Sequence, residues 1–553
     1  MSPPSGVPLL SGRPALPPLQ VRARGHVPRG AGAWRGACHS RKPRTCTTNA
    51  GSSITWQPNS AGFPHGSPCW DSASNSYNNE KSTGGHCMSL PPGHTGPEAG
   101  DNGAADSAAL TPEEHALAAH RLCLGKVQVV PKCPTDRFEQ LALWYTPGVA
   151  AACRAIVRDA DSVDTLTNRA NTIAIVSDGS RILGLGDIGP AAGLPVMEGK
   201  ALLFKVFGGV DAVPLCIDAH DTDEIVAVVK ALAPSFAAIN LEDIAAPKCF
   251  RVLDILRREL PIPVWHDDQQ GTATVVLAGL HNALAIVGKR LEKVRIALIG
   301  IGAANMAVYR LLKSEGAAPS HIVACDSRGI LHPGRADIAA AAAKLPEKWE
   351  VCRETNAAHK AGGIREALAG ADVCIAFSQP GPGTIAAPDI AGMAKDAIVF
   401  ACANPVPEID PKCAKAAGAR IVATGRSDYP NQVNNALAFP AIFRGLLDSG
   451  ASSITDGMVR AAAEAMASAA REKGLRDDAI LPRVDDIDVI AHIAAATALA
   501  AQADGVASRE ASRNALVDGA LARIRRARST AQALCDAGAI PTSEDIARLS
   551  RPA

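Results

Sequence analysis

The sequence predicts an α/β protein of two domains, with a disordered N-terminal extension and a helical C-terminal segment. The first observation is that short apolar runs alternate with helix-length segments, which is typical of parallel, doubly wound sheets. The second is a glycine-rich turn directly after one of these runs. The third is an acidic pair at the end of each of two other runs. We therefore predict an N-terminal α/β catalytic domain followed by a doubly wound, Rossmann-type domain.

The domain boundaries follow from length and from shifts in composition. A chain of 553 residues exceeds one ordinary hydrophobic core, so at least two domains are expected. We place the disordered extension at residues 1–107, the first α/β domain at 108–285, the second at 286–450 and the helical segment that completes the fold at 451–553.

The N-terminal extension has an unusual composition. Residues 1–107 hold 14 of the 39 prolines and 15 of the 48 glycines, without a helical or strand period. Such a segment cannot bury enough apolar surface to offset its conformational entropy, so we expect disorder. Its first 70 residues carry seven arginines and one lysine but no acidic residue, which leaves an organelle transit peptide as an alternative. A further alternative is that translation begins at Met88, so that the residues before it are not part of the protein. We expect a cytoplasmic protein, or one of an organelle matrix if the extension is a transit peptide.

Charge and cysteine usage exclude several classes. The formal net charge is +1, and because the extension is basic, the rest of the chain is net negative and predicts no nucleic-acid binding. The 15 cysteines form no Cys-x-x-Cys pair, which favours reduced thiols in a reducing compartment. No apolar run reaches the roughly 20 residues of a membrane helix, since residues 273–288 are interrupted by His281 and Asn282. We expect no membrane association.

The elements can be placed in order along the chain. A first helix is expected at Pro112, with Thr111 as its N-cap. Short apolar runs that end at turn or polar residues are predicted strands, buried on both faces of a sheet. Strands are expected at 236–241, 262–266, 294–299, 322–325, 373–377, 398–402 and 420–423, and helices at 337–344, 436–447, 458–473 and 487–503.

Two acidic pairs close the two strands of the first domain. Glu242-Asp243 follows residues 236–241, and Asp267-Asp268 follows residues 262–266. The carboxyl ends of parallel strands face one crevice, so the pairs should converge there. Oxygen ligands suit Mg²⁺ or Mn²⁺ better than zinc. Single acids at strand ends are often solvated or cap a helix, but two pairs together favour a metal site.

Lys200 and Tyr145 are candidate proton-transfer residues. Lys200 precedes the apolar residues 201–204, so we expect burial to lower its pKa and to make it a base near neutral pH. The alternative is an exposed lysine. Tyr145 precedes a Pro-Gly turn that can hold a phenol over a cleft, and its alternative is a structural tyrosine.

Candidate substrate contacts carry guanidinium and amide groups. Arg181 lies in a glycine-rich segment where it can grip a carboxylate through two bonds, although a surface ion pair is the alternative. Asn404 follows the predicted strand at 398–402 and is also a candidate contact for the cofactor. Asn434 and Asn435 enter an apolar helix. Amides near strand ends are often turn residues.

A glycine-rich turn opens the second domain. Gly300, Gly302, Ala303 and Ala304 follow the strand at 294–299 and begin a helix. Glycines allow the backbone to approach a pyrophosphate, whose charge is favourable at the helix N-terminus. Asn305 stands where this fingerprint has Gly or Ala.

The next strand offers a contact for the adenosine ribose. Asp326 ends the strand at 322–325 and can accept bonds from the ribose hydroxyls, which favours NAD. Arg328, two residues later, leaves NADP open because it can meet a 2′-phosphate.

Seven motifs together resemble the malic enzyme family, most closely its shorter prokaryotic form. They occur in the family's order over roughly residues 113–505. The motifs are Tyr145–Ala150, Leu183–Gly189, Pro195–Lys200, Asn240–Asp243, His266–Ala273, Ala403–Glu408 and Asn434-Asn435. Trp265 departs from the Phe that relatives usually have.

The resemblance implies oxidative decarboxylation of L-malate to pyruvate and CO₂ with reduction of NAD or NADP. By motif, it assigns metal ligands, a base with its partner, an acid that protonates the enol, and contacts to the substrate. The metal ligands are Glu242, Asp243 and Asp268, and the base is Lys200 with Asp267 as its partner. The acid is Tyr145, and the substrate contacts are Arg181, Asn404, Asn434 and Asn435.

Other functions keep part of this pattern. A malolactic enzyme would retain every motif and release lactate, whereas an oxaloacetate decarboxylase would not need the turn at Gly300. A non-catalytic nucleotide sensor is the third alternative. The resemblance also implies a homodimer or a dimer-based oligomer, in which the segment with Tyr145 or Lys200 can serve a neighbouring site.

Overall fold

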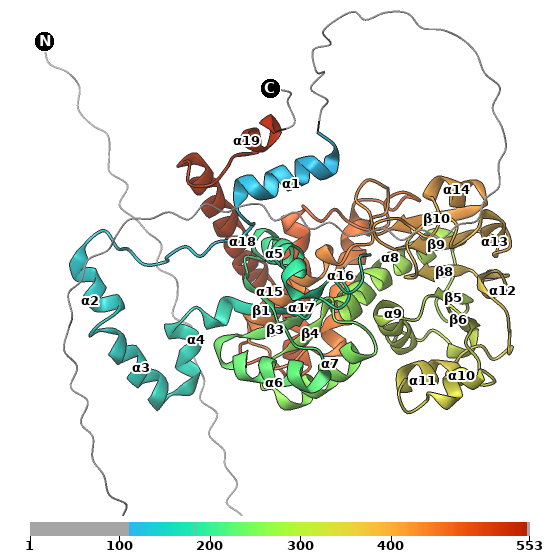
Figure 1. Ribbon diagram of the computed structural model, residues 1–553, viewed down its shortest axis with the longest axis horizontal. Coiled ribbons are helices and arrows are strands. Elements are labelled where there is room, and N and C mark those ends of the chain that lie inside the picture. The colour runs from blue at the N-terminus through green and yellow to red at the C-terminus, as the bar shows by residue number, and fades with distance from the viewer. Residues whose placement is uncertain (1–109, 183, 550–553) are drawn as a thin grey trace, which may run out of the picture. The chain divides into compact units, whose positions relative to one another are not determined.

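The computed structural model describes residues 110–182 and 184–549 (Figure 1). The expected disorder of residues 1–107 lies outside the described residues. Two sheets of mainly parallel strands with helices around them confirm the α/β class, and each sheet lies within one of the two predicted domains. The helical C-terminal segment is also present, as α16–α19.

The first sheet has four parallel strands in the order β2-β1-β3-β4. They are β1 Thr172–Ser177, β2 Asp211–Cys216, β3 Ala238–Leu241 and β4 Val264–His266. Because β3 and β4 are neighbours, with Leu241 paired to His266, the two residues that follow each strand lie side by side. This register is what brings the two acidic pairs together.

The second sheet has six strands in the order β10-β9-β8-β5-β6-β7. They are β5 Ile296–Ile299, β6 Ile322–Asp326, β7 Gly329–Ile330, β8 Val373–Ala376, β9 Ala397–Ala401 and β10 Ala419–Thr424. The chain adds β6 on one side of β5 and then returns to the other side for β8. The order therefore reverses between β5 and β8, which is where doubly wound sheets bind ligands.

Helices connect the strands and complete the fold. They are α1 Pro112–Cys123, α2 Leu141–Trp144, α3 Val149–Arg158, α4 Val163–Leu166, α5 Gly189–Gly208, α6 Thr222–Leu232, α7 Lys248–Glu259, α8 Thr272–Val287, α9 Ala303–Ser314, α10 Ala336–Ala340, α11 Pro346–Glu354, α12 Ile364–Leu368, α13 Ala387–Ala391, α14 Pro411–Ala416, α15 Phe439–Ser449, α16 Asp456–Glu472, α17 Ile487–Ala503, α18 Arg513–Asp536 and α19 Ser543–Arg548. Thr111 caps α1 through a capping box, as predicted. The helix expected at 337–344 is shorter, and the two-residue antiparallel strand β7 was not predicted.

Helix α8 lies in the core and connects the two sheets. With the turn before it, the helical run Asp267–Val287 is long and apolar enough to cross a membrane by length and composition alone, and 67% of that window is buried inside the protein. A run of this length was not expected from the sequence, where the longest apolar run is residues 273–288 and is interrupted by His281 and Asn282. Burial against α9 and α16 accounts for its apolar character.

The C-terminal helices pack closely on α15. Helix α17 lies against α15, α16 and α18, and α18 also contacts α5. At the crossing of α15 and α17, a Cβ on Gly445 would overlap the carbonyl oxygen of Ala494 and would lie 2.9 Å from the Cβ of Thr497. Glycine is therefore required at this position for close approach of two helix backbones.

We expect Gly445→Ala to destabilise the protein by about 1–3 kcal/mol, because the added methyl forces α15 and α17 apart. Gly519→Ala is the matched control, since its Cβ on α18 would meet only the end of the Arg523 side chain, at 3.4 Å. Urea unfolding followed by circular dichroism measures both variants. Equal midpoints for the two would contradict the packing argument.

Candidate active site

The two acidic pairs meet at the carboxyl edge of the first sheet. Glu242 and Asp243 follow β3, and Asp267 and Asp268 follow β4. Glu242, Asp243 and Asp268 each offer a carboxylate oxygen, and these oxygens all lie within 4.8 Å of one another. Three hard oxygen donors at this spacing fit a divalent cation such as Mg²⁺ or Mn²⁺. The structure thus brings together the three predicted metal ligands.

Local backbone geometry joins the two pairs. Asp267–Gly271 form a π-helical turn, a feature that often occurs at functional sites. Asp243 adopts a left-handed conformation, with φ of 54°, and its N–H donates to Oδ2 of Asp268 at 2.8 Å. The N–H of Arg181, from the loop after β1, donates to the carbonyl of Asp243 at 3.0 Å. Three strand ends are therefore connected through Asp243.

Lys200 reaches this cluster from α5. Its Nζ lies 2.6 Å from Oδ2 of Asp267 and 2.9 Å from Oε1 of Glu242, and 4.2 Å from the centre of the Phe439 ring. Burial by itself lowers the pKa of Lys200, but the charges of Asp267 and Glu242 outweigh it and hold the pKa above its ordinary value. The expectation of a lowered pKa is therefore wrong, because it considered burial without the paired carboxylates.

The buried carboxylates of Glu242 and Asp267 also have shifted pKa values. Burial raises the pKa of Glu242 well above its usual range, and the nearby charge of Asp268 adds to this although Lys200 opposes it. Burial also raises the pKa of Asp267, against the effect of Lys200. Four carboxylates surround one ammonium, so the cluster has an excess of negative charge that a divalent cation would neutralise.

Sequence reasoning missed two buried side chains that orient the carboxylates. The indole Nε1 of Trp265 donates to Oδ1 of Asp267 at 3.0 Å, which leaves Oδ2 of Asp267 for Lys200. Nδ2 of Asn240 donates to Oε2 of Glu242 at 2.9 Å. The sequence did contain a signal for Asn240, because a polar amide inside an apolar strand is buried and needs a hydrogen-bond partner.

The predicted substrate contacts lie around this cluster with different roles. The exposed side chain of Arg181 is in the loop joined to Asp243. Asn435 lies near Asp267, because a Cβ on the intervening Gly271 would overlap the Asp267 carboxylate and lie 3.4 Å from the Cβ of Asn435. Asn434, by contrast, uses its side-chain oxygen to cap the turn Asn435–Leu437.

Asn404 connects the two sheets. It follows β9, and a Cβ on Gly184 would lie 2.6 Å from its carbonyl oxygen. The glycine-rich segment with Arg181 thus packs against a loop of the second sheet. This close approach requires glycine at 184.

Tyr145 is not brought to this cluster. It ends α2, its side chain is 73% exposed, and its phenol makes no hydrogen bond with any described residue. Figure 1 shows α2 and α3 standing apart from the strands of the first sheet. Within one chain the structure therefore leaves Tyr145 away from Lys200.

The glycine-rich turn lies at the switch point of the second sheet. Gly300 has φ of 80°, and a Cβ there would overlap the carbonyl oxygen of Phe377 after β8. Gly302 is the exposed N-cap of α9, with nothing within 4 Å of a built Cβ. The half-buried Ala303 and Ala304 form the first turn of that helix. This space before a helix N-terminus fits a pyrophosphate.

Asn305 has a different function from the one predicted. It is fully buried, and its Nδ2 donates to the carbonyls of Ile299 at 3.0 Å, Gly300 at 2.7 Å and Ile375 at 3.1 Å. Its amide nitrogen therefore joins β5 to β8 inside the fold and is not free for a ligand. This explains an Asn in place of the usual Gly or Ala.

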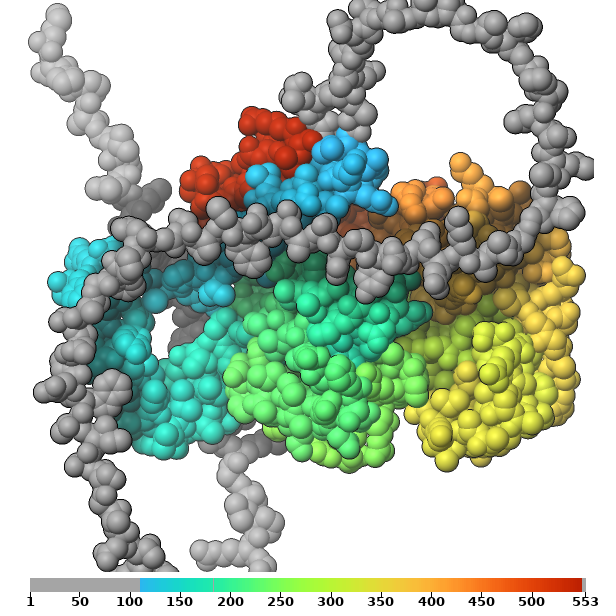
Figure 2. Space-filling model, in the orientation of Figure 1, coloured from blue at the N-terminus to red at the C-terminus, as the bar shows by residue number. Residues whose placement is uncertain are grey.

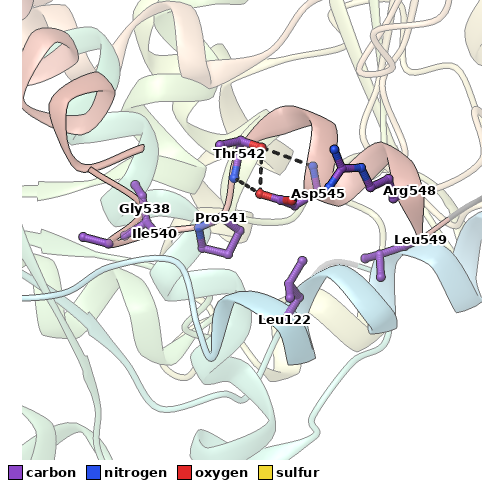
Figure 3. Close-up of a pocket in the computed structure, with 9 residues that line it drawn as sticks. Leu122, Gly538, Ile540, Pro541, Thr542, Asp545, Arg548 and Leu549 are labelled. Carbon is purple, nitrogen blue, oxygen red and sulfur yellow. Dashed lines mark hydrogen bonds and ion pairs between the residues drawn. The ribbon is translucent and has the colours of Figure 1, made fainter. Parts of the chain in front are cut away.

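A surface hollow of about 420 Å³ lies elsewhere, between α1 and the segment before α19 (Figure 3). Apolar side chains such as Leu122 and Leu549 line it. Its polar residues Thr542 and Asp545 bond to each other as a helix cap. The hollow contains none of the predicted site residues, so we do not assign it to catalysis.

Comparison with known proteins agrees with this geometry. Residues 125–257 match the family described as malic enzyme, N-terminal domain, and residues 269–503 match malic enzyme, NAD binding domain. The chain belongs to the malic enzyme family. The first matched region contains β1, β2 and β3 of the first sheet, the second contains the whole second sheet, and β4 lies between the two.

Individual malic enzymes are similar over most of their length. The NAD-dependent malic enzyme of Geobacillus stearothermophilus is 48% identical over 386 residues, or 70% of this chain and 78% of that protein. The bifunctional malic/malolactic enzyme of Bacillus subtilis (strain 168) is 46% identical over 71% of this chain and 94% of that protein. The crystal structure of malic enzyme from Pyrococcus horikoshii Ot3 has a TM-score of 0.72 at 46% identity, over 80% of this chain and 99% of that chain.

The raised pKa of Glu242 predicts that Mn²⁺ binding depends on pH. Because the folded protein binds this proton more tightly than the unfolded chain, metal-free stability falls as pH rises from the ordinary pKa of a glutamate to the raised value. A metal ion displaces the proton and offsets that loss. We therefore expect the rise in Tm caused by Mn²⁺ to grow with pH.

Differential scanning fluorimetry with and without Mn²⁺ measures this effect. Asp268→Asn should reduce the Mn²⁺-dependent rise at every pH, whereas Asp223→Asn, on the exposed side of α6, should leave it unchanged. A rise that shrinks as pH increases would contradict the assignment of Glu242 as a ligand.

Proposed function

We propose that this chain catalyses the oxidative decarboxylation of L-malate to pyruvate and CO₂, with hydride transfer to NAD(P)⁺. The observation that carries the proposal is Lys200, paired with Asp267 and Glu242 beside the acidic triad. A lysine that can pass its proton to an adjacent carboxylate, next to a place for a divalent cation, suits proton removal from a hydroxy acid. Membership of the malic enzyme family supports the same reaction.

The side chains divide the work of this reaction. A divalent cation held by Glu242, Asp243 and Asp268 would polarise the oxygens of the substrate as a Lewis acid. The neighbouring carboxylates hold a proton on Lys200, so before it takes the hydroxyl proton it must pass its own to Asp267, which lies 2.6 Å away and whose pKa burial raises. The Lys200–Asp267 pair thus acts as one proton acceptor.

Binding groups hold the substrate and the cofactor. The guanidinium of Arg181 and the amides of Asn404 and Asn435 suit the two carboxylates of malate. The turn at Gly300 and Gly302 suits the pyrophosphate of the dinucleotide. The contacts between Gly184 and Asn404 place the substrate loop beside the second sheet, where hydride can pass between the two ligands.

A malolactic reaction is the second candidate, because one similar protein is named a bifunctional malic/malolactic enzyme. In that reaction the cofactor would be reduced and then reoxidised before release, so lactate would form without net NADH. The same side chains serve both reactions. Only the fate of the reduced cofactor distinguishes them.

Absorbance at 340 nm with malate, Mn²⁺ and NAD⁺ or NADP⁺ tests the reaction, and chromatography of lactate and pyruvate tests the alternative. We expect Lys200→Ala to lower kcat by about 10²–10⁴-fold, since general-base catalysis contributes that much, while nucleotide binding survives. Lys205→Ala is the matched control, because Lys205 lies on the same helix and pairs with Asp211 outside the cluster. Wild-type turnover of Lys200→Ala would exclude the base assignment.

We also propose that the chain acts as a homodimer. The helices α1 to α4 contain no buried residue. Large apolar side chains are exposed along this segment, among them Leu124, Val129, Phe138, Leu143, Trp144 and Val157. Figure 2 shows α2 and α3 (cyan) projecting from the rest of the described chain. So many exposed large apolar side chains on one segment favour a partner, and a second copy offers the self-complementary contact of a two-fold dimer.

The dimer explains the position of Tyr145. The tyrosine lies on the projecting segment, whereas Lys200 lies in the body of the same chain. We propose that Tyr145 of one protomer completes the Lys200 cluster of the other and protonates the enol carbon. A phenol supplied from outside would be separated from Lys200 on the opposite side of the substrate, as the acid of this reaction requires.

Complementation tests this arrangement. Tyr145→Phe and Lys200→Ala homodimers should each be nearly inactive, but a mixture refolded together should regain activity. Each mixed dimer then holds one site with both native residues. If Tyr145 served its own chain, every site in the mixture would lack one residue and no activity would return. Refolding each variant alone is the control.

A further inference from the structure

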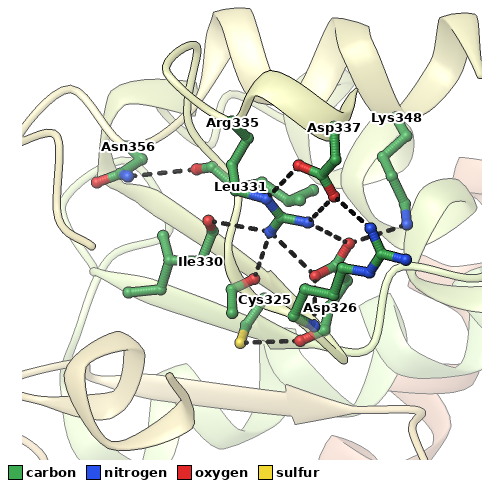
Figure 4. A network of polar contacts seen from close by, with 10 residues as sticks. Cys325, Asp326, Ile330, Leu331, Arg335, Asp337, Lys348 and Asn356 are labelled. Carbon is green, nitrogen blue, oxygen red and sulfur yellow. Dashed lines mark hydrogen bonds and ion pairs between the residues drawn. The ribbon is translucent and has the colours of Figure 1, made fainter. Parts of the chain in front are cut away.

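The carboxylate of Asp326 is the centre of a charged network at the end of β6 (Figure 4). Its Oδ1 accepts the N–H of Arg328 at 2.9 Å and Nη1 of Arg335 at 3.1 Å. Its Oδ2 accepts Nη2 of Arg335 at 3.3 Å and Nζ of Lys348 at 3.1 Å. Arg335 in turn bonds to both oxygens of Asp337, at 2.7 Å each.

This network leaves Asp326 no capacity for a ribose. A carboxylate offers about four acceptor sites, and four donors already occupy those of Asp326. Its side chain is also only 10% exposed. A strand-end acid selects NAD by accepting the ribose hydroxyls, and here that would require breaking an existing ion pair. The sequence-based argument for NAD from Asp326 is thereby removed.

The charges of the network favour an anion instead. Arg328, Arg335 and Lys348 supply three positive charges, whereas Asp326 and Asp337 supply two negative ones. The excess positive charge is on the outside, because the Arg328 side chain is 73% exposed and that of Arg335 only 12%. The side chain of Arg328 bonds to the rest of the network through one contact, from Nη1 to Oδ2 of Asp337 at 3.3 Å. Most of its guanidinium donors are therefore available to a ligand.

The network is also in the right place for the adenosine end of a dinucleotide. Strand β6 pairs with β5, and the N–H of Gly300 donates to the carbonyl of Cys325 at 2.8 Å. The pyrophosphate turn and Asp326 are thus at the ends of two neighbouring strands. In this type of sheet the adenosine ribose lies between those two points.

We propose that this edge of the sheet is a 2′-phosphate site and that the chain prefers NADP⁺ to NAD⁺. Arg328 binds the phosphate, Lys348 adds to its positive field, and Asp326 with Arg335 positions the two cations without contacting the ribose. The inference rests on the dinucleotide part of the proposed function. A phosphate monoester carries close to two negative charges near pH 7, which the network accepts and which a free ribose hydroxyl lacks.

Nucleotide fragments test the inference without malate or turnover. We expect isothermal titration calorimetry to show that wild-type protein binds 2′,5′-ADP at least tenfold more tightly than 5′-AMP, which lacks only the 2′-phosphate. Arg328→Gln should remove most of that ratio, and Lys348→Gln should reduce it less. Arg290→Gln is the matched control, since this exposed arginine precedes β5 at the opposite edge of the sheet and should keep the wild-type ratio.

The outcomes are distinguishable from those of the malate assay. Equal affinity for the two fragments, or a ratio unchanged in Arg328→Gln, would overturn the 2′-phosphate site. If neither fragment bound, the dinucleotide site itself would be wrong and this inference with it. Selective binding of 2′,5′-ADP by a protein that does not oxidise malate would leave the inference standing and remove the proposed reaction.

Discussion

The ion pair of Lys200 with Asp267 and Glu242 is the constraint on which the site depends. These three side chains are buried, so none can be left without its partner at acceptable cost: removing one member of a buried pair typically costs about 3–5 kcal/mol. The interaction also spans three elements, α5, β3 and the turn after β4. It therefore fixes the relative positions of the helix and the sheet edge.

The register of two short strands makes this interaction possible. The pairing of Leu241 with His266 sets the acidic pairs side by side, and the π-helical turn at Asp267 directs consecutive carboxylates to different partners. Asp267 contacts Lys200, while Asp268 joins the triad. One pair of neighbouring residues can thus serve both proton transfer and metal binding.

Some features were predictable because they are local. Apolar runs predicted β3 and β4 of the first sheet and every strand of the second sheet except β7, but they did not predict β1 and β2. The carboxyl-end rule predicted that the acidic pairs converge. Other features depended on partners far away in the sequence. The raised pKa of Lys200 comes from Asp267, 67 residues later, and Lys348, 22 residues after Asp326, occupies an oxygen of that carboxylate. No spacing rule connects such residues.

The sequence by itself determined the class of fold, the glycine-rich turn and the residue types of the site, because these follow from periodicity and from chemistry at strand ends. Only the tertiary structure decided which of those groups remain free to act. Asn305 is buried and Asp326 largely buried, and both are bonded to other parts of the protein, so they have a structural role. Arg328 remains exposed, and Tyr145 lies on a projecting segment. A side chain's chemistry is set by its type, but its availability is set by the neighbours that folding brings to it.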